Sequence, residues 1–299
     1  MPAAEIDNLG HMNTNFYVQR AREAGGLLLD GLGAGAAARR EAGLIVEAVD
    51  CHNHFRREQM QGALLRLSGG VVAAAGARFE LYLEMDNVRA QETAAMFRLT
   101  MELQHKVTRR PAEASAPWLR AAQQALVEPP GRSRPQTLTF ERLGVGLTPD
   151  DFARAGVRPH LRREIPAAEC DADGFLAPEP RLRTVPDSFP SQGVMDQIWH
   201  RFEGFAWPLL ELRTHDLRRP RAGDVLETYA ALLSVGHKVI HWGSWVFEAR
   251  TGALVSIYQQ ANILFNLATR RPQDMSAEVR AEMTALSSPG LPVAHQAPG

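Results

Sequence analysis

The sequence predicts an α+β protein in which one helix is followed by long antiparallel strands, and in which this order occurs twice along the chain. Two observations lead to this class. Residues 14–30 have apolar side chains at helical spacing, and later segments alternate apolar and polar side chains with the period of two of half-buried strands. In addition, two short pieces of sequence from the first half of the chain recur in the second half.

The recurring pieces are separated by nearly the same distance. Residues 1–13 share six of their thirteen positions with residues 165–177, at an offset of 164, and TRRP at residues 108–111 recurs at residues 269–272, at an offset of 161. We interpret the chain as two homologous units with a small difference in loop length. Coincidence in an alanine- and arginine-rich chain is the alternative. The first unit is then residues 1–112, and a connector follows over residues 113–157. The second unit is residues 158–272, and residues 273–299 form a C-terminal helix and tail.

The elements of the first unit follow from its periodicity. The helix predicted over residues 14–30 ends at the glycines that follow it, and its apolar face consists of Tyr17, Ala21, Ala24 and Leu28. Residues 77–85 and 97–103 alternate apolar and polar side chains, which predicts two strands of an antiparallel sheet with one apolar face. A single central helix can cover that face.

The second unit shows the same order of elements. Four prolines interrupt residues 177–192, so its helix is predicted only over residues 193–206. The strands of this unit are predicted over residues 225–233, 236–248 and 257–267. Three short helices are predicted outside the helix and strands of the two units. One covers residues 112–128, one begins at the start signal Thr148-Pro149-Asp150-Asp151, and one covers residues 276–286.

The two units differ at their beginnings. Residues 157–165 precede Pro166 and can form a first strand of the second unit. Only Met1 precedes Pro2, so we expect the first unit to lack this strand, or the natural chain to start further upstream. A missing strand leaves a sheet edge unpaired or brings another segment into its place.

Composition and charge argue against several classes of protein. The net charge of −1 provides no basic excess for nucleic acid. Two cysteines make no disulfide framework and fit a reducing cytosol, so we expect a cytoplasmic protein. No apolar run approaches the ~18 residues of a membrane span, and the N-terminus lacks the features of a signal peptide. We therefore expect no membrane partner. No metal, dinucleotide or serine-hydrolase motif is present in the sequence.

The sharpest local signal is the sequence DNLGHMNTNFY, from Asp7 to Tyr17, at the start of the first helix. A helix N-terminus has a partial positive charge and unpaired backbone N–H groups, and Gly10 lets the backbone approach a ligand closely. Such a site can hold the oxyanion that forms on a carbonyl, while Asp7 activates water or attacks the carbonyl itself. His11 and Asn13 can orient the water or the substrate.

Each of these residues also has a purely structural interpretation. Asp7 can be an N-cap or a carboxylate that faces the helix dipole. His11 can be a packed loop histidine, Asn13 can be the N-cap residue and nothing more, and Tyr17 can belong to the core.

The same segment resembles the D-x-x-G-H-x-N-x-x-[YF] signature of hotdog-fold thioesterases, the 4-hydroxybenzoyl-CoA thioesterase-like and acyl-ACP thioesterase-like group. With the repeat, the resemblance covers residues 1–112 and 158–272. It implies a tandem double hotdog, in which each unit is an antiparallel β-sheet wrapped around a central α-helix. It also implies a thioesterase that hydrolyses an acyl thioester of CoA or of an acyl carrier protein and needs no metal or other cofactor.

The resemblance places the catalytic carboxylate at Asp7, as general base or nucleophile. The other expected catalytic residues are His11 and Asn13, and the expected substrate- or oxyanion-binding residues are Gly10, Tyr17, His237 and Lys238. His237 and Lys238, on a predicted strand, are included because a hotdog site forms where the helix end of one unit meets the strands of the other. Solvation at a sheet edge is their alternative role. Both units lie in one chain, so we expect an intramolecular pseudo-dimer and leave a further homo-oligomer open.

The second copy of the motif departs from the pattern. Asp171 and Gly174 remain, but the histidine and the asparagine are replaced by Phe175 and Ala177. We therefore expect a degenerate second site. Plant-type acyl-ACP thioesterases also have an asparagine two residues after the aspartate, where this chain has Leu9.

Two other functions stay open at this point. One is a catalytically silent hotdog protein that binds an acyl thioester as a sensor or scaffold. The other is a hotdog hydratase acting on enoyl-CoA, which typically uses an Asp/His pair at a spacing that this chain lacks. A hydrolase differs from both in releasing free thiol from an acyl thioester at a rate that depends on Asp7.

Overall fold

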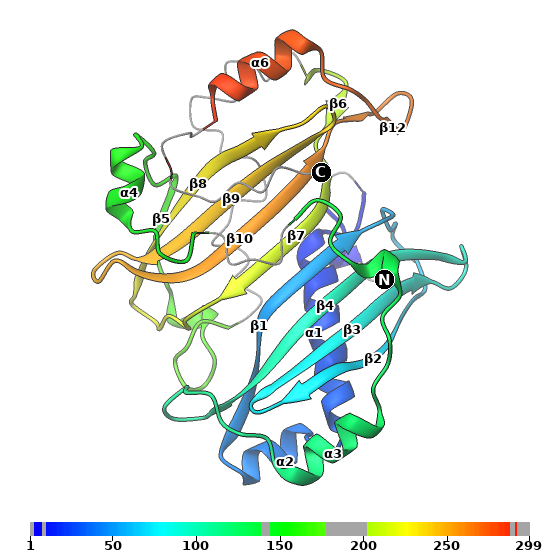
Figure 1. Ribbon diagram of the computed structural model, residues 1–299, viewed down its shortest axis with the longest axis vertical. Coiled ribbons are helices and arrows are strands. Elements are labelled where there is room, and N and C mark those ends of the chain that lie inside the picture. The colour runs from blue at the N-terminus through cyan, green and yellow to red at the C-terminus, as the bar shows by residue number, and fades with distance from the viewer. Residues whose placement is uncertain (1–2, 8–9, 139–143, 178–201, 288–290, 292–299) are drawn as a thin grey trace. The chain divides into compact units, whose positions relative to one another are not determined.

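The chain divides into two compact units, Met1–Pro135 and Gln136–Gly299, each with its own antiparallel sheet (Figure 1). Among the described residues, every helix is too short or too polar to reach across a lipid bilayer. The computed structural model describes residues 3–7, 10–138, 144–177, 202–287 and 291.

The first unit contains one long helix and four strands. Its helices are η1 Ala3–Glu5, α1 Thr14–Gly31, α2 Ala36–Glu41, α3 Ala116–Gln124 and η2 Gly131–Ser133. Its strands are β1 Leu44–Phe55, β2 Leu65–Ala75, β3 Arg78–Asn87 and β4 Glu92–His105. The strands are antiparallel, in the order β2-β3-β4-β1.

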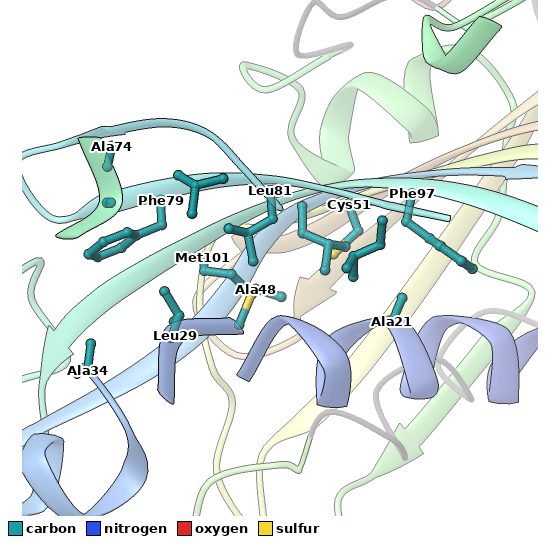
Figure 2. Packing of buried hydrophobic residues seen from close by; sticks show 14 of the residues in the cluster. Ala21, Leu29, Ala34, Ala48, Cys51, Ala74, Phe79, Leu81, Phe97 and Met101 are labelled. Atoms are coloured by element: carbon teal, nitrogen blue, oxygen red, sulfur yellow. The ribbon is translucent and has the colours of Figure 1, made fainter. Parts of the chain in front are cut away.

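Helix α1 packs along one face of this sheet (Figure 2). The side chains that alternate along β3 and β4 form the sheet side of the core, as the sequence predicts. The core residues of α1 include Tyr17, Ala21 and Leu29, and those of the two strands include Phe79, Leu81, Leu83, Met85, Phe97, Leu99 and Met101. Gly25 of α1 allows the helix to approach closely, because a Cβ there would lie 3.3 Å from both Leu81 and Leu99.

The second unit contains a five-stranded sheet, in the order β7-β10-β9-β8-β5, and a small sheet, in the order β12-β11-β6. Its strands are β5 Leu161–Glu164, β6 Phe205–Ala206, β7 Leu209–Asp216, β8 Val225–Val235, β9 Val239–Glu248, β10 Ala253–Ile263, β11 Phe265–Asn266 and β12 Arg271–Pro272. Its helices are α4 Pro149–Arg154, η3 Ala167–Glu169 and α6 Ala277–Ala285.

The two sheets have the same strand register when 161 is added to each residue number of the first. Val71 pairs with Leu81 between β2 and β3, Leu232 pairs with Trp242 between β8 and β9, and a bulge follows directly in both ladders. The bulges between β1 and β4 and between β3 and β4 coincide in the same way with those of the second sheet. A bulge inserts one extra residue at one point of a ladder. The second sheet therefore reproduces the first pair by pair.

The outer edges of the two sheets are covered differently. In the second unit, β5 pairs with the edge of β8. Among the described residues of the first unit, no strand precedes β1. Part of the matching edge, on β2, is covered by the segment after α3. Leu126 forms a parallel bridge with Val71, and the Val127 N–H donates to the Val71 carbonyl at 2.8 Å.

The structure confirms the α+β class with one antiparallel sheet in each unit. The helix predicted over residues 14–30 is α1. The start signal at Thr148 is the N-cap of α4, where the Thr148 side chain and the Asp151 side chain form a capping box. The helix predicted over residues 193–206 falls mostly on residues outside those described, and its last two residues form β6. The sequence analysis did not predict α2, β1, β2 and β7.

Two adjacent glycines of α1 test the packing of the helix on the sheet. A Cβ at Gly26 would meet no atom within 4 Å, in contrast to Gly25. Leucine at either position removes the helix penalty of glycine, roughly 1 kcal/mol. We expect Gly26→Leu to maintain or raise the free energy of unfolding. Gly25→Leu is expected to lower it by about 1–3 kcal/mol, because the side chain overpacks the core. Urea denaturation followed by circular dichroism measures both, and equal effects would contradict the packing.

Candidate active site

Two loops of the first unit meet at the N-terminus of α1. The motif loop is residues 7–13, and the strand-end loop is residues 56–60, which follow β1. The Met12 N–H donates to the Gln59 carbonyl at 2.7 Å, and His11 forms an antiparallel bridge with Met60. These backbone contacts hold the motif loop against the end of β1.

Asp7 organises the motif loop. Its Oδ1 accepts from the His11 N–H at 3.0 Å, and its own N–H donates to the His11 carbonyl at 2.7 Å. Its carbonyl accepts from the Gly10 N–H at 3.1 Å, while Gly10 adopts a φ of 87°, in the left-handed region that favours glycine. The Asp7 side chain is half-buried, and a carboxylate can accept several hydrogen bonds at once. Its loop-stabilising role is therefore compatible with a second role toward a ligand.

Asn13 is the N-cap of α1, and its side chain accepts from the Asn15 N–H at 2.9 Å. The N–H groups of residues 10–13 all donate within the unit. Within the described part of the chain, no acceptor pairs with the N–H of Thr14, the first residue of the helix. Because Gly10 uses its N–H inside the loop, the donor that the described residues of this segment offer to a ligand is the Thr14 N–H. The sequence predicts unpaired N–H groups at this helix start but does not indicate which one is available, since a backbone N–H leaves no mark on residue type.

The strand-end loop brings a carboxylate to His11. The His11 Nε2 lies 3.5 Å from the Glu58 Oε2, with the histidine side chain 19% exposed and the glutamate 37% exposed. This pair can orient the imidazole ring toward a ligand and pass a proton to it. Glu58 is far from the motif in the sequence, so neither periodicity nor the motif indicates it.

Tyr17 and Gln59 hold the strand-end loop in place. The Tyr17 hydroxyl donates to the Arg57 carbonyl at 3.3 Å, and its ring meets Phe55 edge-on, with 5.5 Å between the centroids. Burial raises the pKa of Tyr17 far above its usual value, so the hydroxyl stays a donor. The Gln59 side chain accepts from Asn87 at 2.7 Å. Tyr17 is thus a core residue that positions the loop.

The second unit repeats the backbone of this site. The Asp171 Oδ1 accepts from the Phe175 N–H at 3.0 Å, and the Asp171 N–H donates to the Phe175 carbonyl at 2.8 Å. The Leu176 N–H donates to the Pro220 carbonyl at 2.8 Å, which is the equivalent of the bond between the two loops of the first unit. The same loop geometry therefore carries different side chains.

Arg219 changes the chemistry of the second loop. It stands 161 residues after Glu58, at the matching position. Its Nη2 donates to the Asp171 Oδ2 at 3.0 Å, and its guanidinium lies 5.6 Å from the centre of the Phe175 ring. Arg221 lies over the same ring at 4.2 Å. The carboxylate–histidine pair of the first unit is thus replaced by arginines on an aromatic ring, and the Asp171 carboxylate is in an ion pair.

His237 and Lys238 lie in the turn between β8 and β9 and not on a strand. Arg280 of α6 approaches both ring nitrogens of His237, at 3.0 and 3.1 Å. The Lys238 Nζ lies 3.9 Å from the Asp274 Oδ2. Their expected position opposite Asp7 stays a prediction.

Residues 1–123 match the family model described as the thioesterase-like superfamily. No curated protein matches the sequence. The structure is similar to an acyl-ACP thioesterase from Bacteroides thetaiotaomicron, with a TM-score of 0.65 and 12% identity over 88% of this chain and 93% of that one. It is also similar to the 12:0-ACP thioesterase from Umbellularia californica, with a TM-score of 0.64 and 10% identity over 91% and 92% of the two chains.

These similarities define the fold as the hotdog fold, and they extend over nearly the whole chain, which fits two hotdog units in tandem. Residues 1–123, which contain the motif loop and the strand-end loop, form a domain of the thioesterase-like superfamily. The first unit is accordingly a thioesterase domain, and members of this superfamily hydrolyse acyl thioesters.

The two arginines beside Phe175 test the ion pair of the second loop. The Arg219 side chain is 9% exposed and bonds to Asp171, whereas Arg221 is exposed. We expect Arg219→Met to lower the free energy of unfolding by about 1–3 kcal/mol, because it leaves a partly buried carboxylate without its cation. Arg221→Met removes only a contact with the ring, worth about 0.5–1 kcal/mol at an exposed site. Thermal unfolding of both variants measures the difference, and an equal loss would show that the ion pair is unimportant.

Proposed function

We propose that the first unit hydrolyses acyl thioesters of CoA or of an acyl carrier protein at the motif loop, with Asp7 as general base or nucleophile. The observation that supports this most is the position of the Asp7 carboxylate ahead of α1, next to a helix N-terminus whose Thr14 N–H has no acceptor among the described residues. The match of residues 1–123 to a thioesterase-like family supports the choice of a thioester as substrate.

In the general-base form of the reaction, Asp7 accepts a proton from water as the water oxygen bonds to the thioester carbonyl carbon. The carbonyl oxygen becomes an oxyanion and accepts a hydrogen bond from the Thr14 N–H, which the positive end of the helix dipole assists. The C–S bond then breaks, and the sulfur takes up a proton. In the nucleophilic form, Asp7 bonds to the carbonyl carbon first, the C–S bond breaks and the thiolate leaves and takes up a proton, and water then hydrolyses the resulting anhydride to the free acid and the Asp7 carboxylate.

His11 and Glu58 support this reaction. With its Nε2 toward Glu58, the His11 ring has a fixed orientation in which it can position water or deliver the proton to sulfur. Asn13 supports the site by capping the helix. Gly10 supports it by its left-handed backbone conformation.

A thiol-release assay over acyl-CoA and acyl-ACP chain lengths tests the proposal. We expect turnover, and we expect Asp7→Asn to lower kcat by at least ~100-fold, since a positioned acid–base group contributes that much or more. Asp171→Asn is the matched control, because its carboxylate is already paired with Arg219. We expect it to leave turnover nearly unchanged. Equal losses at unchanged stability would mean that both loops are catalytic. Saturable binding without thiol release would favour a sensor or scaffold.

Glu58→Gln tests the role of the His11 pair. Loss of the charge 3.5 Å from the His11 Nε2, in a pair whose partly exposed position limits its worth to about 0.5–1 kcal/mol, is expected to lower kcat about 2- to 5-fold. KM is expected to stay constant, because the residue positions a catalytic group and does not bind the substrate. Glu80→Gln, on the exposed face of β3, is the control. A rise in KM at constant kcat would instead make Glu58 a substrate-binding residue.

A further inference from the structure

The outer edge of β2 has no strand beside it over most of its length in the described part of the chain. β2 is the last strand of the first sheet (Figure 1). The Val88 N–H donates to the Leu64 carbonyl at 2.9 Å, so the backbone groups of Leu64 point toward β3. The direction alternates along an antiparallel strand, so every second residue from Leu65 to Gly69 points its N–H and C=O outward. The segment after α3 meets this edge only beyond them, at Val71.

The second unit shows that these backbone positions accept an antiparallel strand. Thr228 stands 161 residues after Leu67, at the matching position of β8. It lies opposite Leu161 of β5, and its carbonyl accepts from the His160 N–H at 3.0 Å. The first unit therefore presents an edge whose counterpart is paired in the second.

The outer edges of the two sheets also differ in charge. Strand β5, at the outer edge of the second sheet, has three charged residues among four, namely Arg162, Arg163 and Glu164. Natural sheets use such charges to prevent their edges from pairing with other chains. The open stretch Leu65–Gly69 has only Arg66, beside leucine, serine and glycine. The sequence of β2 thus lacks the protection that β5 has.

Exposed apolar side chains gather at both ends of the open stretch. Nine large apolar side chains are exposed in the described part of the chain, and five of them lie at these two ends. They are Met60, Leu64 and Val88 at the start of β2, and Leu126 and Val127 beside Val71 at the other end. Exposed apolar side chains grouped in this way indicate an interaction surface.

We propose that this edge pairs with the same edge of a second copy of the chain, so that two first-unit sheets join through antiparallel β2 strands. Pairing about a two-fold axis uses the same surface of both copies. The axis passes through the middle of the open stretch, and Leu67 then stands opposite Leu67 of the second copy. In this register Leu65 stands opposite Gly69, and Arg66 stands opposite Ser68, so the outward backbone groups of the two strands meet.

This register is self-complementary in charge and in apolar surface. Arg66 meets an uncharged serine, so no like charges stand opposite each other in the paired stretch. Leu64 of one copy reaches Gly70 of the other, against which Val127 packs, since a Cβ at Gly70 would lie 2.7 Å from a Val127 methyl group. The apolar start of each β2 thereby meets the apolar end of the other, which removes both from water. A strand of another protein would need this match by chance, whereas a second copy has it by symmetry.

Sedimentation velocity of the full-length protein from about 1 μM to 1 mM tests the pairing, because weak interfaces associate in this range. We expect a dimer whose fraction rises with concentration. Ser68→Glu places a carboxylate opposite Arg66 of the second copy, twice in each dimer, and is expected to lower the dimer Kd about 2- to 30-fold. Ser68→Lys places like charges there and is expected to raise the Kd by a similar factor. A chain that stays monomeric throughout overturns the inference.

The neighbour of Ser68 within the sheet separates this effect from an effect on folding. Ser68 stands opposite Glu84 of β3. Within the monomer, Ser68→Glu therefore opposes a like charge and Ser68→Lys an opposite charge. We expect the Tm of the monomer and the strength of the dimer to change in opposite directions. Kd values that follow the Tm, or that respond to neither substitution, contradict the pairing.

The apolar ends give a second comparison. Leu64→Glu is expected to raise the dimer Kd about 10- to 100-fold, because two half-exposed leucines in each dimer lose their burial. Val107→Glu, at an exposed valine after β4, is the matched control and is expected to leave the Kd unchanged. Equal effects of the two substitutions would show that the ends of β2 are not in the interface.

Hydrogen exchange locates the contact. We expect the outward amides of residues 65, 67 and 69 to exchange more slowly as the dimer forms, and Ser68→Lys to remove that protection. A dimer without this protection uses another surface and overturns the inference. The peptide HLRREI, residues 160–165, is the probe for a foreign strand. If it protects these amides in a chain that stays monomeric, the edge takes strands of other chains, and the pairing of two copies is wrong.

Discussion

The site of the first unit depends on one backbone hydrogen bond, from the Met12 N–H to the Gln59 carbonyl. This bond joins the loop before α1 to the loop after β1. It therefore holds the helix N-terminus and residue Glu58 in fixed positions relative to each other. Packing of α1 on the sheet fixes the distance between the helix and the sheet. The bond fixes the position of the start of the helix relative to the end of β1. The equivalent bond of the second unit, between Leu176 and Pro220, persists although the side chains around it have changed. The geometry of the loop is therefore set by backbone hydrogen bonds, and the two units differ in the side chains that this backbone carries.

Residues with regular periodicity were predictable, and residues whose environment comes from distant parts of the chain were not. The helix α1 and the strands β3 and β4 each place apolar side chains on the core side and mostly polar side chains on the other, which leaves a periodic pattern in the sequence. Strand β1 has no such pattern, because the consecutive polar residues His52, Asn53 and His54 are all buried. The motif indicated the loop and Asp7. Glu58 becomes visible only when the end of β1 is brought to the motif loop, and the Thr14 N–H only when the acceptors of the neighbouring N–H groups are known.

The two units show how one geometry can support two different electrostatic arrangements. At the position of Glu58 the second unit has Arg219, and at the position of His11 it has Phe175. The two changes suit each other: an arginine at the position of Glu58 would remove the acceptor beside His11, whereas an arginine on a phenylalanine ring is favourable. The aspartate that both loops retain accepts backbone bonds in both units, so its presence alone does not distinguish a catalytic loop from a structural one.

The coinciding bulges of the two sheets mean that the strands of one unit correspond residue by residue to the strands of the other. Each bulge inserts one residue and reverses the faces of the side chains that follow, so a strand can be transplanted only together with its bulge. Because all three bulges lie at matching positions, the hairpin of β9 and β10 has the same pairing register as that of β3 and β4, and matching residues lie on the same face of each sheet. The offset difference of three residues lies between the motif loop and the first long strand of each unit. Exchange of segments between the two halves therefore preserves residue register throughout the sheets. It changes the length of the chain, by three residues, only at that one junction.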